Sequence, residues 1–60
     1  MKEYRVSWYV FIDEKGGIEG RTLLRGNHID KVLAHFKMKL SKEYYVRPAS
    51  IYIIDTVEIH

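Results

Sequence analysis

The sequence predicts an α+β domain of ββαβ order, with one helix packed on one face of a three-stranded antiparallel sheet. Two stretches near the ends of the chain, Tyr4–Ile12 and Ala49–Ile59, are rich in β-branched and aromatic residues, which favour strands. Between them, Asn27–Leu40 carries apolar residues at the spacing of an amphipathic helix. The chain of 60 residues predicts a single domain, residues 1–60, that buries only about 60% of its unfolded surface.

The predicted helix organises the rest of the chain. Its apolar residues recur at offsets of 0, 3, 4, 7 and 11 and form one narrow stripe: Ile29, Val32, Leu33, Phe36 and Leu40. Asn27 is expected to cap the first turn with its side-chain oxygen, and Asp30 places a carboxylate near the positive end of the helix. We expect the helix to fray through Ser41–Tyr45, with an extended connection following at Val46–Pro48.

The first predicted strand, Tyr4–Ile12, is apolar on both faces in its middle, which favours a central position in the sheet. One face carries its even-numbered residues: Tyr4, Val6, Trp8, Val10 and Ile12. Asp13–Gly17 predicts a turn, because glycines adopt positive φ at no steric cost. The second strand, Ile18–Arg25, is less apolar and suits a sheet edge.

The last predicted strand contains one awkward residue, Asp55. By strict alternation it shares a face with apolar residues: Ile51, Ile53, Val57 and Ile59. A carboxylate in an otherwise apolar row is costly to bury, so we expect a bulge, a strand end or a partner's cationic group near Asp55. A helical crossover between the second and third strands gives the sheet order 2-1-3, with Tyr4–Ile12 in the centre.

One helix covers only one face of this sheet. The side chains expected to meet the helix are Val6, Trp8, Val10, Leu24, Ile51 and Ile53. The opposite face, called the open face below, would carry Tyr9 and Phe11 at its centre, Leu23 on one side, Tyr52 and Ile54 on the other, and a rim of Arg5, Glu19, Arg21 and Arg25. Five large apolar side chains, at roughly 100 Å² or more each, approach or exceed what a soluble monomer normally exposes. We therefore expect the open face to have a partner.

Three kinds of occupant fit the open face. A second copy of the chain would give a homodimer the core that one chain lacks. A different protein would be anchored by aromatic and arginine side chains: Tyr9, Phe11, Arg21, Arg25 and Tyr52. A single-stranded nucleic acid would stack its bases on the aromatic rings. Nucleic acid is disfavoured by the acidic residues that lie at or near the sheet: Asp13, Glu14, Glu19, Asp55 and Glu58.

A second surface is predicted on one flank of the helix, where basic side chains gather: Lys31, His35, Lys39 and Lys42, with His28 close by. A charged flank of this kind is usually just the solvated side of a helix. As a binding site, it would steer an acidic partner toward the protein by long-range attraction.

The sequence lacks the residue patterns of an enzyme or a metal site. His28 and His35 are about 10.5 Å apart along a helix, which is too far for both to bind one ion, and His60 would have to fold back to join them. The three serines have no base at motif spacing. We therefore expect no catalytic residues, no metal and no cofactor.

Charge and composition narrow the location and the partners. A formal net charge of +2 is too weak to indicate nucleic acid by itself. The charged N-terminus lacks the apolar run of a signal peptide, and no segment approaches the roughly 20 apolar residues that a membrane span requires. With no cysteine in the chain, disulfides cannot supplement a small core. These features predict a cytoplasmic protein that does not insert into a membrane.

The layout of the whole chain carries a resemblance. The aromatic-rich strand Tyr4–Ile12, the turn at Gly16-Gly17, the helix start Asn27–Asp30 and the strand segment Ser50–Ile54 are together similar to the very short accessory proteins of bacteriophages and prophages. Those of known role often bind and disable a host protein, including components of CRISPR, restriction and Hachiman-type anti-phage defence. The resemblance implies a stoichiometric inhibitor, and it carries over no functional residue.

The leading hypothesis from the sequence is therefore a non-enzymatic, homodimeric binding protein that blocks a bacterial defence or host protein, acting in the cytoplasm of the bacterial host. The alternative is a small nucleic-acid-binding module that uses the same open face.

Overall fold

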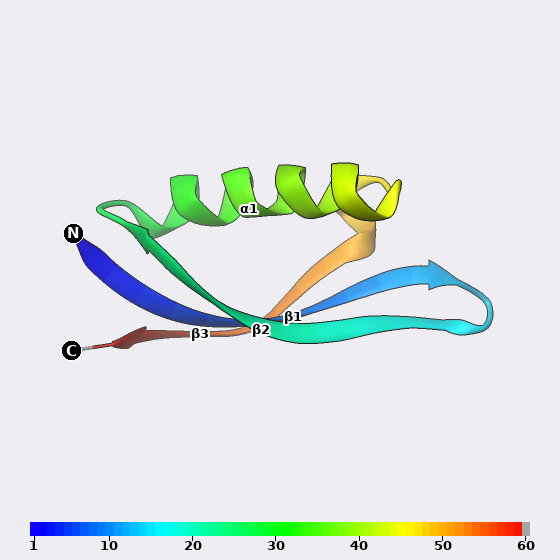
Figure 1. Ribbon diagram of the computed structural model, residues 1–60, viewed down its shortest axis with the longest axis horizontal. Helices are drawn as coiled ribbons and strands as arrows, with labels where there is room; N and C mark the ends of the chain where they lie inside the picture. Colours follow the sequence, from blue (N-terminus) through cyan, green and yellow to red (C-terminus); the bar gives the residue numbers. More distant parts are fainter. Residues whose placement is uncertain (60) are drawn as a thin grey trace.

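The computed structural model describes residues 1–59 and confirms the predicted fold, with one helix above a three-stranded antiparallel sheet of order β2-β1-β3 (Figure 1). The elements are β1 (Lys2–Asp13), β2 (Gly16–Gly26), α1 (Ile29–Tyr44), a short 3₁₀ helix η1 (Pro48–Ser50) and β3 (Ile51–Ile59). The molecule is elongated, with extents of 38 × 16 × 14 Å. His60, which the sequence offered as a third histidine, lies outside the described residues.

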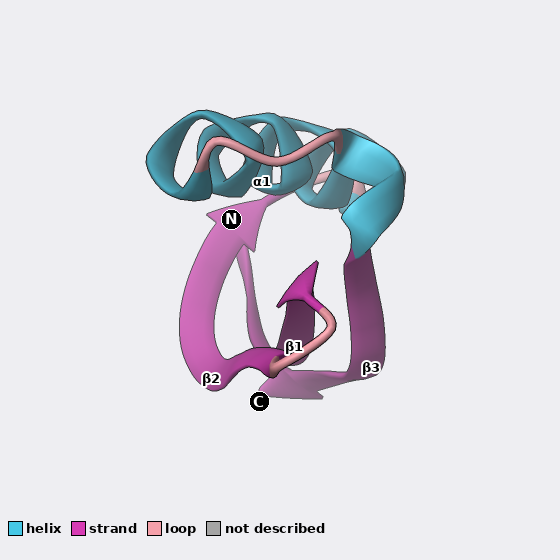
Figure 2. Ribbon diagram, turned by 90° about the vertical axis from the view of Figure 1, so that its right-hand side faces the viewer, coloured by secondary structure: helices cyan, strands magenta, loops and turns pink. Residues whose placement is uncertain are grey.

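The sheet is strongly curved rather than flat. Seen along the long axis, β2 and β3 rise on either side of β1 toward α1, so that the helix closes a trough (Figure 2). Such curvature follows from the right-handed twist of strands, which accumulates in long hairpins. The concave side of the trough holds the core, and the convex side is the open face.

The core lies between α1 and the even-numbered residues of β1, as the alternation predicts. The buried apolar side chains are Tyr4, Val6, Trp8, Val10, Phe36, Leu40 and Ile51. The ring of Trp8 lies edge-on to Phe36 with centroids 6.2 Å apart, and Leu24 and Ile53 pack against the same cluster. Of the predicted helical stripe, Phe36 and Leu40 are buried, and the other three residues are half-buried.

The hairpin of β1 and β2 is closed by the predicted turn. The backbone N–H of Lys15 donates a hydrogen bond to Oδ1 of Asp13 at 2.8 Å, and Gly16 has a φ of +123°. A side chain is strained at such a φ, so the glycine is needed where the chain reverses. The strand β2 already begins at Gly16, earlier than the predicted start at Ile18.

The hairpin extends beyond the third strand. β3 begins at Ile51, opposite Val10, so the stretch 11–17 forms a two-stranded arm that also projects past the C-terminal end of α1 (Figure 1). Two apolar side chains on this hairpin arm, Phe11 and Ile12, are exposed, and Ile18 is exposed at its base. One expectation is thereby corrected. Phe11 lies on the arm rather than at the centre of the open face, because β3 stops short of it.

A bulge in β3 resolves the position of Asp55. Ser7 pairs with Asp55 and Trp8 pairs with Ile53, so Ile54 is an extra residue on β3. Residues paired directly across two strands lie on the same face, and the bulge therefore places Asp55 on the open face with Ser7. The expected bulge is confirmed, and the strict alternation assumed beyond it is wrong. Val57 and Ile59 move to the open face, whereas Thr56 and Glu58 move to the helix side.

The start of α1 differs from the prediction. The helix begins at Ile29, and its N-cap is His28, whose side chain makes no capping hydrogen bond. Asn27 therefore does not cap the helix. Asp30 does lie in the first turn, where a carboxylate interacts favourably with the helix dipole.

The end of α1 is ordered rather than frayed. Tyr44 completes the last turn and lies 6.2 Å from the ring of Trp8, centroid to centroid. Tyr45 then adopts a left-handed conformation, with φ of +56°. The backbone N–H of Val46 donates to the carbonyl oxygen of Ser41 at 3.1 Å, and the Ser41 hydroxyl donates back to the carbonyl oxygen of Val46. The chain then enters η1, so Ala49 and Ser50 precede the strand rather than belong to it.

Candidate functional site

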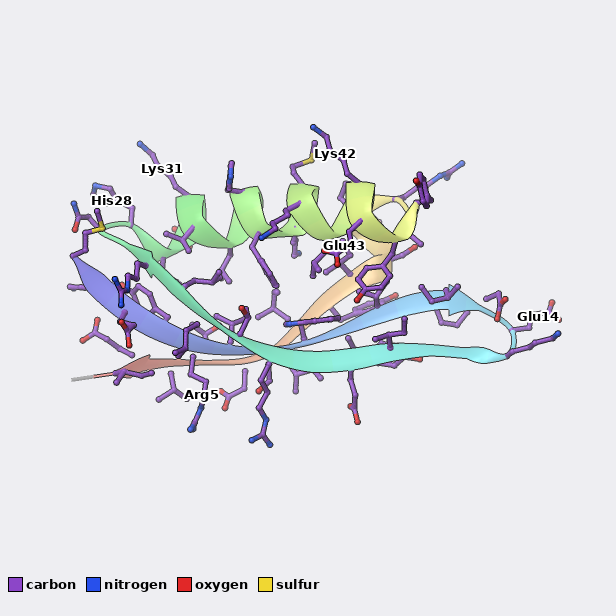
Figure 3. The ribbon with its side chains drawn as sticks, viewed as in Figure 1. Arg5, Glu14, His28, Lys31, Lys42 and Glu43 are labelled. Atoms are coloured by element: carbon purple, nitrogen blue, oxygen red, sulfur yellow. The ribbon has the colours of Figure 1, made fainter. Side chains whose placement is uncertain are left out.

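The open face is built from rows of residues that pair across the three strands. From one end of the sheet to the other, the rows are Arg25–Glu3–Ile59, Leu23–Arg5–Val57, Arg21–Ser7–Asp55 and Glu19–Tyr9–Tyr52. The side chain of Arg5 points away from α1, on the far side of the sheet (Figure 3). Within the described residues, no helix covers this face. The structure thus brings together Tyr9, Arg21, Leu23, Arg25 and Tyr52 of the predicted site and separates Phe11 from them.

Apolar side chains on this face are more exposed than a core would allow. Leu23 exposes 60% of its surface, Tyr52 56% and Ile54 60%. Val57 and Ile59 are exposed beside them, and sequence analysis missed both because it assumed unbroken alternation along β3. The signal that could have placed them is Asp55, since a bulge beside it inverts the parity of every following residue.

The centre of the open face is an aromatic pair. The rings of Tyr9 and Tyr52 lie side by side across β1 and β3, with centroids 6.4 Å apart and an interplanar angle of 40°. Tyr9 also lies across Gly17 of β2, where an added Cβ would approach the Tyr9 hydroxyl oxygen at 2.7 Å. Tyr9 is therefore held between its two neighbouring strands and is half-buried, whereas Tyr52 remains exposed.

Charges on the open face are balanced. Three arginines, Arg5, Arg21 and Arg25, are accompanied by three carboxylates, Glu3, Glu19 and Asp55. Nε of Arg25 donates a hydrogen bond to Oε2 of Glu3 at 3.0 Å. A hollow of about 390 Å³ in the middle of the sheet is lined by both signs of charge, including Arg21 and Asp55, together with Ile54 of the bulge. The face therefore has no net sign that would favour a polyanion.

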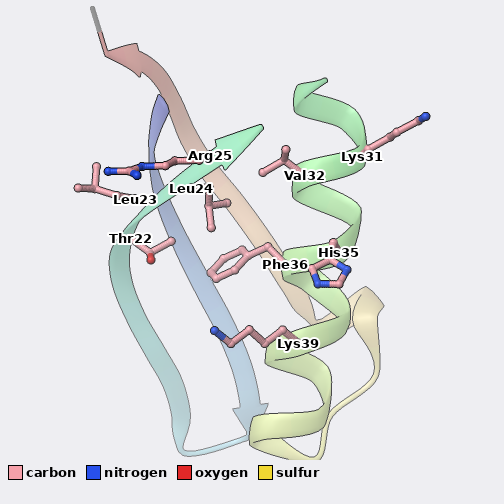
Figure 4. A pocket seen from close by; sticks show the side chains of 9 residues that line it. All are labelled: Thr22, Leu23, Leu24, Arg25, Lys31, Val32, His35, Phe36 and Lys39. Atoms are coloured by element: carbon pink, nitrogen blue, oxygen red, sulfur yellow. The ribbon is translucent and has the colours of Figure 1, made fainter. Parts of the chain in front are cut away.

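A groove of about 460 Å³ separates α1 from β2. Figure 4 shows Leu24, Val32 and Phe36 pointing toward one another at its floor, while Lys39 reaches from α1 toward β2 and Lys31 points away from the groove. Its nine lining residues are Thr22, Leu23, Leu24, Arg25, Lys31, Val32, His35, Phe36 and Lys39. This groove, called the α1–β2 groove below, contains three residues of the predicted basic flank. Lys42 is not among the lining residues. Its side chain points away from the sheet (Figure 3).

Other classes of site find no support in the described part of the chain. Among residues 1–59, no three histidine or acidic side chains lie close enough together to hold a metal ion. No helix formed by these residues is long and apolar enough to cross a membrane.

Comparisons with models of known protein families, with curated proteins and with solved structures found no match to this chain. The candidate sites are therefore argued from their geometry alone.

Proposed function

We propose that this chain is a small non-enzymatic binding protein that docks onto another protein through its open face. The observation that supports this most directly is the exposure of Leu23, Tyr52 and Ile54 on a sheet face that no described element covers. A partner would bury these side chains, and each buried large apolar side chain contributes about 1.5–3 kcal/mol of hydrophobic free energy. Binding by occupancy needs a firm surface with a few aromatic and arginine anchors, and no reactive group.

A protein partner fits the open face better than a nucleic acid does. Phosphate backbones are held by surplus positive charge, and the three arginines of this face are matched by three carboxylates. A face that carries both signs of charge around an apolar centre is suited to a protein surface of complementary charges.

The biological consequence that we propose is inhibition. The similarity in size and layout to short bacteriophage accessory proteins supports a role in which the chain, as a homodimer in the bacterial cytoplasm, occupies the working surface of a host or defence protein. A small chain suits this mode of action because inhibition is stoichiometric, so the protein needs to bind and does not need to turn over.

The test is capture of the partner from bacterial lysate with the wild-type chain and two charged variants. Leu23→Glu places a carboxylate on the open face, and Lys42→Glu places one on the solvated side of α1 as the control. We expect mass spectrometry to identify a protein that is retained by the wild type and by Lys42→Glu and is lost with Leu23→Glu. Equal retention by all three chains would contradict docking through the open face.

The nucleic-acid alternative is favoured by one specific observation, the side-by-side rings of Tyr9 and Tyr52 with Arg21 nearby on the same face. Such rings can stack unpaired bases. Titration with single-stranded DNA and RNA at two salt concentrations distinguishes the two classes. Binding that weakens steeply with salt and is lost with Tyr52→Ala would support this alternative over protein docking, and absence of binding at low salt would remove it.

A further inference from the structure

The α1–β2 groove has an apolar floor and an uncompensated positive rim. Its floor is formed by Leu24, Val32 and Phe36. Its rim carries Lys39, which reaches across the groove, with His35 beside it and Lys31 at the edge pointing away (Figure 4). None of its nine lining residues is acidic, and among the described residues neither Lys31 nor Lys39 forms an ion pair. Arg25, also at the rim, is already paired with Glu3. The groove is therefore complementary to a segment that combines apolar side chains with carboxylates.

The hairpin arm (residues 11–17) has this complementary chemistry. It exposes two apolar side chains, Phe11 and Ile12, with Ile18 exposed at its base, and its charged residues are Asp13, Glu14 and Lys15. Two of these three charges are negative. The arm contains only two strands, and a two-stranded hairpin without a third strand or a helix against it is marginally stable in water. Its exposed apolar side chains thus lack the cover that α1 gives to one face of the rest of the sheet.

We propose that the α1–β2 groove of one copy binds the hairpin arm of a second copy. The arm projects beyond the C-terminal end of α1, whereas the groove lies along the earlier turns of α1 (Figure 1). The two surfaces are thus displaced along the long axis of the molecule. A two-fold axis between two antiparallel copies then allows each arm to enter the other copy's groove, which closes the assembly as a dimer.

This contact explains how the chain self-associates, so it rests on the homodimer of the proposed function. It places the dimer contact away from Tyr9 and Tyr52 at the centre of the open face, although Leu23 and Arg25 line the groove as well. The centre of the open face of each copy is then free for the foreign protein. A free acidic peptide from another protein fits the same charge pattern. The second copy is favoured because it supplies the arm at a fixed position and gains cover for Ile12 and Ile18 at the same time.

A charge exchange between Lys39 and Glu14 tests the contact. Lys39 reaches across the groove, and Glu14 lies at the tip of the arm (Figures 3 and 4). Reversal of either charge replaces attractions with repulsions in both halves of the dimer, so Lys39→Glu and Glu14→Lys should each raise the dimer dissociation constant about fivefold or more. Sedimentation equilibrium at low salt measures this constant.

Rescue makes the test specific. An equimolar mixture of Lys39→Glu and Glu14→Lys, or the double variant, should recover most of the wild-type association, because every groove then meets an arm of opposite charge. Lys42→Glu carries the same charge change on α1 outside the groove and should leave the constant within about twofold.

Three outcomes would overturn the proposal. The first is a chain that remains a monomer at all concentrations, and the second is a mixture that shows no rescue. The third is dimerisation that is lost with Tyr52→Ala, a change on the open face outside the groove, and is unaffected by Lys39→Glu. The last result would place self-association on the open face. Capture of a foreign partner is measured separately, so failure of the arm contact leaves the proposed binding function testable.

Discussion

The indole of Trp8 lies across the sheet on Gly20, its register partner on β2. A Cβ added to Gly20 would approach Cζ2 of Trp8 at 2.6 Å, which is closer than real Cβ contacts. The largest side chain of the core thus occupies the space that the smallest residue of the neighbouring strand leaves empty. Contact with Phe36 and Tyr44 on the other side fixes the ring between β2 and α1.

Substitution of Gly20 should therefore weaken the fold. In Gly20→Ala, Trp8 must move within a packed core, and such overpacking costs about 1–3 kcal/mol of unfolding free energy. Urea denaturation followed by circular dichroism measures the loss.

The same substitution made in the Trp8→Phe background is the control. The smaller ring relieves the contact, and it also removes the buried Nε1 donor of Trp8, which has no hydrogen-bond partner within the described residues. Gly20→Ala should cost clearly less there than in the wild type. An equal cost in both backgrounds would show that the indole does not set the requirement for glycine.

Sequence patterns predicted the element order, the sheet order and most of the core. Apolar residues repeat every two positions along the strands and about every 3.6 positions along the helix, which places them on one side of each element. The patterns failed where one residue breaks the period. The extra residue Ile54 moves Val57 and Ile59 to the opposite face of the sheet. The composition of β3 indicates a bulge near Asp55, but it does not say on which face Val57 and Ile59 then lie.

The sequence pattern also did not predict where β3 begins and how α1 ends. Phe11 and Ile12 alternate like the rest of β1, so their apolar character does not reveal that β3 and α1 end before reaching them. The last turn of α1 was expected to fray before the extended connection at Val46–Pro48, and no glycine stands there to end the helix. A tyrosine adopts the left-handed conformation there instead, and packing of Tyr44 on Trp8 holds the turn.

Tyr45 provides a prediction of increased stability. Its φ of +56° is unfavourable for a residue with a side chain, and the side chain is 95% exposed, so it contributes little packing. Tyr45→Gly should raise the free energy of unfolding by about 0.5–1 kcal/mol, the relief of left-handed strain exceeding the added flexibility of the unfolded chain.

Thermal and urea denaturation of Tyr45→Gly provide the measurement. Lys42→Gly, within α1, is the matched control and should destabilise by about 1 kcal/mol, since glycine is a poor helix former. A loss of stability in Tyr45→Gly would mean that the tyrosine ring makes contacts that its exposure does not reveal.

The bulge makes opposite predictions for two residues that strict alternation would place together. Asp55 lies on the open face and is exposed, so Asp55→Ala should change the unfolding free energy by no more than about 0.5 kcal/mol. Ile53 packs against the core, and Ile53→Ala should cost about 1–3 kcal/mol. Chemical denaturation of both variants decides the register. Comparable large losses at both positions would be inconsistent with the bulge.

Leu23 and Leu24 form the sharpest matched pair for separating folding from binding. They are adjacent on β2 and chemically identical, yet Leu24 packs against the core and Leu23 exposes 60% of its surface on the open face. Leu24→Ala should cost about 1–3 kcal/mol of unfolding free energy, and Leu23→Ala no more than about 0.5 kcal/mol.

The effects of these two substitutions on binding should have the reverse order, with the larger loss at Leu23. A partner on the open face buries Leu23, so Leu23→Ala should weaken the affinity for the captured protein about tenfold, the equivalent of about 1.4 kcal/mol. Leu24→Ala, measured at a temperature where it remains folded, should bind nearly as tightly as the wild type. Isothermal titration calorimetry on both variants gives the affinities. If Leu23→Ala bound as well as the wild type, the docking surface would have to lie elsewhere on the molecule.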